Sequence, residues 1–174
     1  MSNYTIVKYG DPILRKVVDP VEQVTPELVK LTDVMLAIMR KSSGVGLAAN
    51  QIGLDTAIAV IGYRETEMRM FNPKIVERSG ESQTYGEGCL SVPGVDGDVK
   101  RALEVRATWT DQTGAPQERR FTGHLARIVQ HEVDHLNGII IVNHLSMAAR
   151  TLHRKQLDAL QIEAKAALRR RVGK

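Results

Sequence analysis

The spacing of apolar side chains along the chain predicts three helices. The first opens at Thr25-Pro26, where a capping residue precedes a proline, continues with apolar residues at helical spacing and ends at 42–44. A second helix is expected over 122–137, with Gly138 as its stop. A third is expected near the C-terminus, where the apolar residues share one face: Leu157, Leu160, Ala164 and Leu168.

Strands are predicted where apolar residues alternate with polar ones or form short runs. The clearest is 103–110, which 111–114 turns back into 116–121 as an antiparallel hairpin. Segment 68–76 is expected at a sheet edge, because Asn72-Pro73 interrupts it. Two further short strands are expected at 56–61 and 139–142, after an extended lead-in at 11–24; 77–88 is expected to be a polar connection.

Helices that are segregated from hairpin-joined strands indicate an α+β fold. A chain of 174 residues fits a single domain over 1–174, with antiparallel sheets packed around the 122–137 helix. No run of 18 apolar residues and no export signal is present, so we expect no membrane segment and a cytoplasmic location. The single cysteine excludes an internal disulfide.

The net charge of +4 is concentrated at the C-terminal end of the chain. Residues 150–174 carry two acidic side chains, Asp158 and Glu163, against a much larger basic set. The rest of the chain therefore has a small negative charge. The basic residues of this predicted helix are Arg150, Arg154, Lys155, Lys165, Arg169, Arg170, Arg171 and Lys174.

The motif that carries chemistry is His-Glu-Val-Asp-His at 131–135, within the second predicted helix. At about 100° per residue, His131 and His135 face the same way, while Glu132 falls inside the apolar stripe. An ionised carboxylate there is costly unless something compensates it. The pattern predicts a metal ion held by the two imidazoles, with Glu132 as base. The alternative is two histidines at the edge of the core and an ion-paired glutamate.

A catalytic site of this kind needs a third protein ligand. One metalloprotease class has a third histidine at the position of Ile141, so this chain does not fit that class. Another class uses a glutamate further along the chain. Here that would be Glu163, which is a poor candidate because it lies in the basic tail. His124 is about 10 Å of helical rise from His131, which is too far. His144 stays open as a candidate. Cys89, the only thiol, lies in a loop after a glycine, and a thiolate is a strong ligand for zinc and iron.

Three stretches resemble the motifs of the peptide deformylase family. They are Gly44–Gln51, Glu87–Ser91 and Gln130–Gly138, and their order and spacing agree with the family over essentially the whole chain. The resemblance implies a metal-dependent amidase that removes the formyl group from the N-terminal formyl-methionine of nascent bacterial proteins, its expected partners. No membrane or DNA partner is expected.

The resemblance also implies a role for individual positions. Cys89, His131 and His135 would hold one divalent ion, natively Fe²⁺, with Zn²⁺ or Ni²⁺ also accepted. Glu132 would be the general acid and base, and the Gln51 amide and the Leu90 N–H would stabilise the oxyanion. The substrate would be bound around Val45, Gly46, Tyr85, Arg101, His124, Arg127 and Ile128.

Two positions depart from the family pattern. Asn143 stands where the family usually has a carboxylate, and His124 where the residue is usually apolar. A generic zinc endopeptidase of the HExxH type is the alternative function. The basic helix at 150–174 is predicted either to contact ribosomal RNA or to be a solvated amphipathic helix packed on the body.

Overall fold

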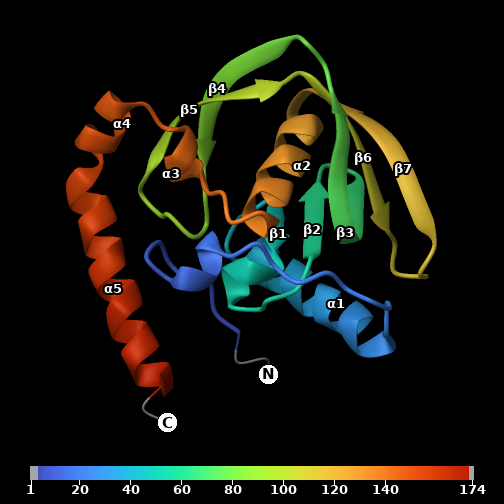
Figure 1. The fold of residues 1–174 in the computed structure, drawn as a ribbon, viewed down its shortest axis with the longest axis horizontal. Helices are drawn as coiled ribbons and strands as arrows, with labels where there is room; N and C mark the ends of the chain where they lie inside the picture. The colour runs from blue at the N-terminus through green and yellow to red at the C-terminus, as the bar shows by residue number, and fades with distance from the viewer. Residues whose placement is uncertain (1–3, 173–174) are drawn as a thin grey trace.

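The computed structural model describes residues 4–172, and side chains to residue 170, and shows two antiparallel sheets (Figure 1). The larger sheet has five strands in the order β1-β2-β3-β6-β7, and the smaller pairs β4 with β5. The strands are β1 Gly46–Ala48, β2 Ile58–Tyr63, β3 Thr66–Arg78, β4 Ser82–Gly88, β5 Asp96–Ala102, β6 Glu104–Thr110 and β7 Pro116–Thr122.

Helix α2, Gly123–Leu136, contacts strands of both sheets and lies between them (Figure 1). Its apolar side chains, such as Val129 and Val133, pack with Met70 and Phe121 from the larger sheet. The predicted helix, the hairpin at 103–121 and the α+β class are therefore confirmed. The other helical elements are η1 Pro12–Arg15, α1 Pro26–Lys41, η2 Ala49–Ile52, α3 Ile141–His144, α4 Met147–Leu152 and α5 Arg154–Val172.

Helix α1 begins as predicted, since the Thr25 hydroxyl accepts the N–H of Leu28 and Pro26 is the first helical residue. Met35 and Met39 of this helix are completely buried against the larger sheet. The segment 44–53 then leaves α1, supplies the edge strand β1 and ends in η2.

Two strand predictions were wrong. Segment 68–76 belongs to β3, which lies in the interior of the sheet between β2 and β6. Asn72-Pro73 is tolerated there because the register shifts between Phe71 and Lys74, and Asn72, with φ +53°, bonds the backbone of Val21 instead. Residues 139–142 form no strand, because the Asn143 side chain accepts the N–H of Ile140 and opens the short helix α3.

Residues 77–88 were expected to be a polar connection, but much of this segment forms β4. Glu87 is the one buried side chain of this strand, so no apolar alternation marks it. The lead-in at 11–24 contains the 3₁₀ turn η1, which Asp11 caps.

The C-terminal helix is divided at His153 into α4 and α5. Leu157, Leu160 and Ala164 are buried as their spacing predicted, while Leu168 is half-buried. The Arg171 side chain and Lys174 lie outside the described part of the chain. Within residues 4–172, no helix is both long and apolar enough to span a bilayer.

Candidate metal centre

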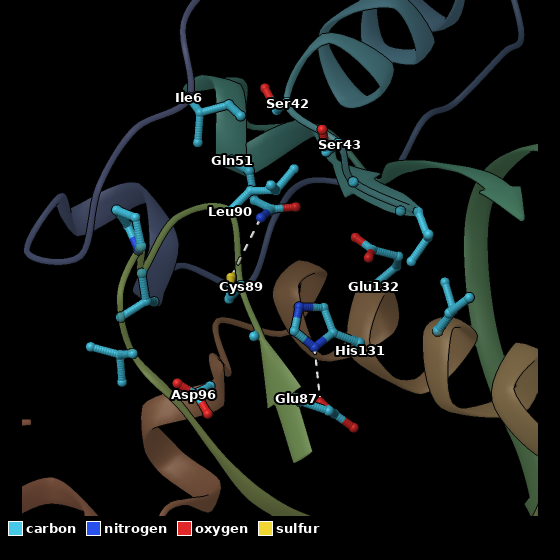
Figure 2. A pocket seen from close by; sticks show the side chains of 18 of the residues that line it. Ile6, Ser42, Ser43, Gln51, Glu87, Cys89, Leu90, Asp96, His131 and Glu132 are labelled. Carbon is cyan, nitrogen blue, oxygen red and sulfur yellow. Dashed lines mark hydrogen bonds and ion pairs between the residues drawn. The ribbon is translucent and has the colours of Figure 1, made fainter. Parts of the chain in front are cut away.

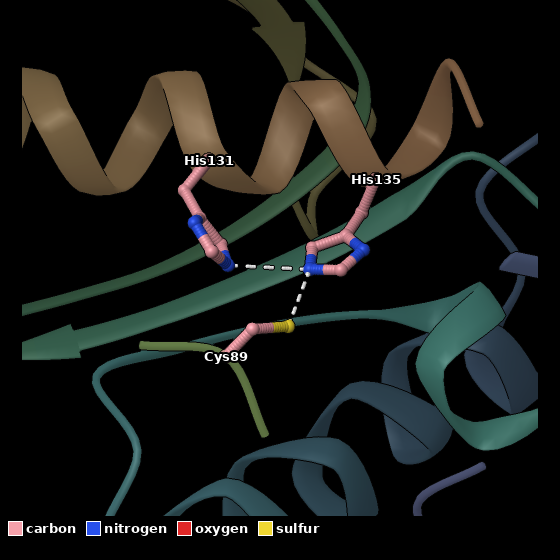
Figure 3. A group of neighbouring side chains, drawn as sticks. All are labelled: Cys89, His131 and His135. Atoms are coloured by element: carbon pink, nitrogen blue, oxygen red, sulfur yellow. Dashed lines mark hydrogen bonds between the residues drawn. The ribbon is translucent and has the colours of Figure 1, made fainter. Parts of the chain in front are cut away.

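Three side chains from two elements converge at one point (Figure 3). His131 and His135 come from successive turns of α2, and Cys89 from the loop after β4. The ligand atoms of the three all lie within 4.8 Å of one another. The Nε2 atoms of the two rings are 3.2 Å apart, and Cys89 Sγ is 3.3 Å from Nε2 of His135.

This donor set fits a divalent metal ion. Two imidazole nitrogens and a sulfur lie close enough together to contact one ion, and His135 is completely buried. Thiolate and imidazole ligands together suit zinc or iron, and three protein ligands leave a position open for chemistry. His144, the other candidate ligand, instead lies 2.8 Å from Oδ2 of Asp134.

Glu87 orients His131 from the side away from the cluster. Its Oε2 lies 3.1 Å from Nδ1 of His131, so the other ring nitrogen, Nε2, faces the cluster. Arg101 binds the same carboxylate with two bonds, of 2.9 and 3.0 Å. Burial alone would raise the pKa of Glu87, but the bonds from His131 and Arg101 outweigh it and hold the pKa well below its usual range.

The two histidines differ in their electrostatic surroundings. Burial lowers the pKa of His135 well below its usual value, and the nearby charge of His131 adds to this effect. Burial also acts to lower the pKa of His131, but hydrogen bonds to Cys89 and Glu87 outweigh it and raise the pKa. His135 is thus held as a neutral imidazole, the form that binds metals.

Glu132 faces the same space as Cys89 and His131 (Figure 2). It is buried, and its Oε2 atom has no hydrogen-bond partner among the described residues. Burial raises the pKa of this carboxyl to about 7. Its other oxygen lies against Gly46 of β1, so closely that a Cβ at this position would overlap the carboxylate.

Gln51 and the loop after β4 lie on the other side of the cluster (Figure 2). Gln51 Oε1 accepts the N–H of Ala48, which directs Nε2 toward Cys89 Sγ, 3.7 Å away, and Ser91 Oγ, 3.3 Å away. The Cys89 carbonyl accepts the N–H of Val92 at 2.9 Å. Because a trans peptide directs its C=O and N–H to opposite sides, the Leu90 N–H is turned away from Val92.

These side chains line a cavity of about 630 Å³. The residues of the proposed chemistry are all part of its lining: Glu132, Gln51, Leu90, Cys89 and His131. The predicted substrate-binding residues on its wall are Val45, Gly46, His124, Arg127 and Ile128.

Tyr85 and Arg101 are not among the lining residues. Tyr85 is exposed with its ring 5.9 Å from the Arg127 guanidinium, and Arg101 is buried against Glu87 and Asp134. The sequence did not predict several other lining residues, such as Ile6 and Lys8, because they come from segments without motif or periodicity.

The two residues that depart from the family pattern, Asn143 and His124, each contact neighbouring residues. Asn143 Oδ1 accepts from Arg15 as well as from Ile140, so this position is bonded without a carboxylate. His124 is exposed at the cavity wall, and its ring lies 5.0 Å from that of Tyr63.

Comparison with known proteins gives one consistent family. Residues 3–151 match the family described as polypeptide deformylase. The peptide deformylase of Carboxydothermus hydrogenoformans is 44% identical over 142 residues, 82% of this chain and 93% of the relative. That of Rhizorhabdus wittichii is 40% identical over 177 residues, 96% of this chain and 100% of the relative.

Solved structures agree with the sequence relatives. Peptide deformylase from Plasmodium falciparum superposes with a TM-score of 0.89 at 35% identity, covering 93% of this chain and 98% of its own. The Thermus thermophilus enzyme gives 0.88 at 38% identity, covering 92% and 99%. These matches do not favour the generic endopeptidase. The chain belongs to the polypeptide deformylase family, metal-dependent hydrolases that remove the N-formyl group from nascent polypeptides.

Proposed function

We propose that Cys89, His131 and His135 hold a single divalent ion, natively Fe²⁺, beside which the formyl group of N-terminal formyl-methionine is hydrolysed. The observation that carries the proposal is the convergence of the three donors within 4.8 Å, in a cavity that Glu132 also lines. A divalent ion held there would supply a Lewis acid and lower the pKa of water toward about 7. The choice of iron comes from the family resemblance, and metal analysis of anaerobically purified protein tests it.

Glu132 moves the proton in this proposal. Its buried Oε2 atom, which has no other partner among the described residues, takes a proton from water. It then delivers that proton to the methionine nitrogen as the formyl C–N bond breaks, so formate and a free amino terminus result. Gly46 supports this role, because only a residue without a side chain leaves room for the carboxylate.

The oxyanion of the tetrahedral intermediate is bound by two donors of the chain. The Gln51 amide is fixed through Oε1, which leaves Nε2 beside the cluster. The Leu90 N–H belongs to the same loop as Cys89, and the Val92 N–H fixes its peptide plane. Donors fixed before the reaction need no reorganisation, and losing one typically costs about 10²–10³-fold in rate.

The methionine side chain occupies the part of the cavity lined by Val45, His124 and Ile128. Burying such a side chain contributes about 1.5–3 kcal/mol. Gly46 begins β1, an edge strand of the larger sheet, and Val45 directly precedes it, so the backbone at 45–46 can pair with the extended peptide. His124 adds a polar group to this wall, so exchanging it for leucine should lower KM for formyl-methionyl peptides.

The deciding experiment measures formate released from formyl-Met-Ala-Ser by the wild type and by Glu132→Ala. The variant should keep its metal and lose activity, whereas the exposed control Glu118→Gln should keep both. Unchanged turnover in Glu132→Ala would contradict the mechanism. Digestion of casein by the same preparation would instead favour the endopeptidase.

We also propose that the enzyme works in the cytoplasm and contacts the ribosome through α5. The exposed face of this helix carries Arg154, Lys155, Lys165, Arg169 and Arg170, which suits phosphate contacts. Deleting the helix would expose the core around Leu157 and Leu160. Replacing the five basic side chains by glutamine is therefore the cleaner test. Ribosome co-sedimentation at low salt should fall in that variant, and unchanged co-sedimentation would contradict the contact.

A further inference from the structure

Arg127 was expected to bind substrate, but its guanidinium is engaged within the protein. The residue is 7% exposed and lies one helical turn before His131 on α2. Its Nη1 donates to Glu87 Oε1 at 2.6 Å and to the Val99 carbonyl at 2.9 Å, while Nη2 donates to the Gln83 carbonyl at 2.7 Å. Both terminal nitrogens are therefore directed at protein acceptors.

These three bonds join the two elements that carry the donor atoms. Gln83 lies on β4 and Val99 on β5, the strands on either side of the loop that holds Cys89. The third acceptor, Glu87, bonds His131 through its other oxygen. One side chain of α2 thus fixes the hairpin that presents the sulfur and, through Glu87, the orientation of an imidazole.

We propose that Arg127 is a positioning residue that sets the distance between Cys89 Sγ and the two imidazoles, and does not itself bind substrate. The proposal rests on the metal site proposed above. Arg101 contributes differently, because it lies on β5 itself and connects Glu87 to Asp134. The planar, five-donor guanidinium is needed, because a lysine ammonium cannot reach two strands and a carboxylate in the same way.

The test follows the release of zinc to a chelator from zinc-loaded protein without substrate. Removing an outer partner of a metal ligand typically costs about 10–100-fold in affinity. We expect release to be about tenfold faster in Arg127→Met and intermediate in Arg127→Lys. The thiolate-to-metal absorption of the cobalt-loaded protein should shift in the same order, a change that lower stability alone would not produce.

Arg69→Met is the matched control. Arg69 is half-buried, pairs with Glu67 on its own strand β3 and connects β3 to α1 through Asp33, away from the cavity. Its loss should lower the melting temperature and leave zinc release and the cobalt spectrum unchanged.

The proposal is overturned if folded Arg127→Met releases zinc at the wild-type rate. If that variant also has a raised KM, Arg127 is a substrate-binding residue. If the methionine variant does not fold, the lysine variant decides: unchanged release and spectrum there also overturn it. A wild type that binds no zinc through Cys89 would refute the metal site itself, which is a different result from wild-type binding with insensitive variants.

Discussion

Arginine–glutamate pairs occur in two contrasting surroundings in this protein. Around Glu87, between the β4–β5 hairpin and α2, the side chains of Arg101, Arg127 and Glu87 are 5%, 9% and 6% exposed. On the β3–β6–β7 surface, Arg106 binds Glu77 and Glu118 with side chains that are 38% to 52% exposed. The chemistry is the same, but water screens only the second group.

The contrast shows what each group of charges does. Exposed pairs contribute little to stability, since solvent competes for both partners. A buried pair gains little overall, but removing one partner leaves the other charge uncompensated. The inner group, called here the Glu87 cluster (Glu87, Arg101, Arg127 and His131), therefore orients His131, a proposed metal ligand, and burying these charges costs free energy that the exposed pairs do not cost.

Glu87→Gln should have the largest effect. Two buried guanidinium groups lose their carboxylate, which typically costs about 3–5 kcal/mol of unfolding free energy. Urea unfolding in the presence of a chelator measures this without the contribution of bound metal. A loss below about 1 kcal/mol, equal to that of an exposed control such as Glu118→Gln, would remove the distinction between the two regions.

Gly46→Ala should be next, because the added Cβ overlaps Glu132 and displaces its carboxylate. Formate release should fall about 100-fold, which corresponds to about 2.7 kcal/mol in the barrier, while metal content stays the same. Gly80→Ala is the control, since a Cβ there meets no atom within 4 Å. Activity near wild type in Gly46→Ala would show that the position of Glu132 does not matter.

The Asp134–His144 pair lies between the two extremes, with 15% and 30% exposure. Burial would raise the pKa of Asp134, but the bond from His144 and the charge of Arg101 outweigh it and lower the pKa. A lowered folded pKa stabilises the fold above the ordinary carboxyl pKa of about 3.9, and this contribution is lost as pH falls through the folded value. His144→Ala should cost about 1 kcal/mol at about pH 6, and less as Asp134 becomes protonated. A cost that did not fall as Asp134 becomes protonated would contradict the assigned partner.

Arg106→Gln should have the smallest effect. Loss of its two exposed pairs should cost about 0.5 kcal/mol, and less in about 1 M salt, where charges are screened. Urea unfolding at low and high salt measures both values. A loss of several kcal/mol would show that exposure does not separate the two groups.

Helix α2 could be predicted from the sequence because its apolar side chains, which pack against both sheets, recur at helical spacing. That spacing also places His131 and His135 on the same side of the helix. The sequence could not predict β4, whose only buried side chain is charged, or the interior position of β3, where Asn72 replaces missing strand contacts with bonds to Val21. The contact of Cys89 with His135, 46 residues later, depends on the same hairpin. Periodicity carries no information about such a distance, so the choice of Cys89 over His144 came from the family resemblance.

The most direct test of the account is the X-ray absorption spectrum of the zinc-loaded protein. The proposed site should give one sulfur at about 2.3 Å from the zinc, the usual zinc–thiolate distance, two imidazole nitrogens at about 2.0–2.1 Å, and one further light ligand. A spectrum with no sulfur in the first coordination shell, or with four protein ligands, would contradict the account.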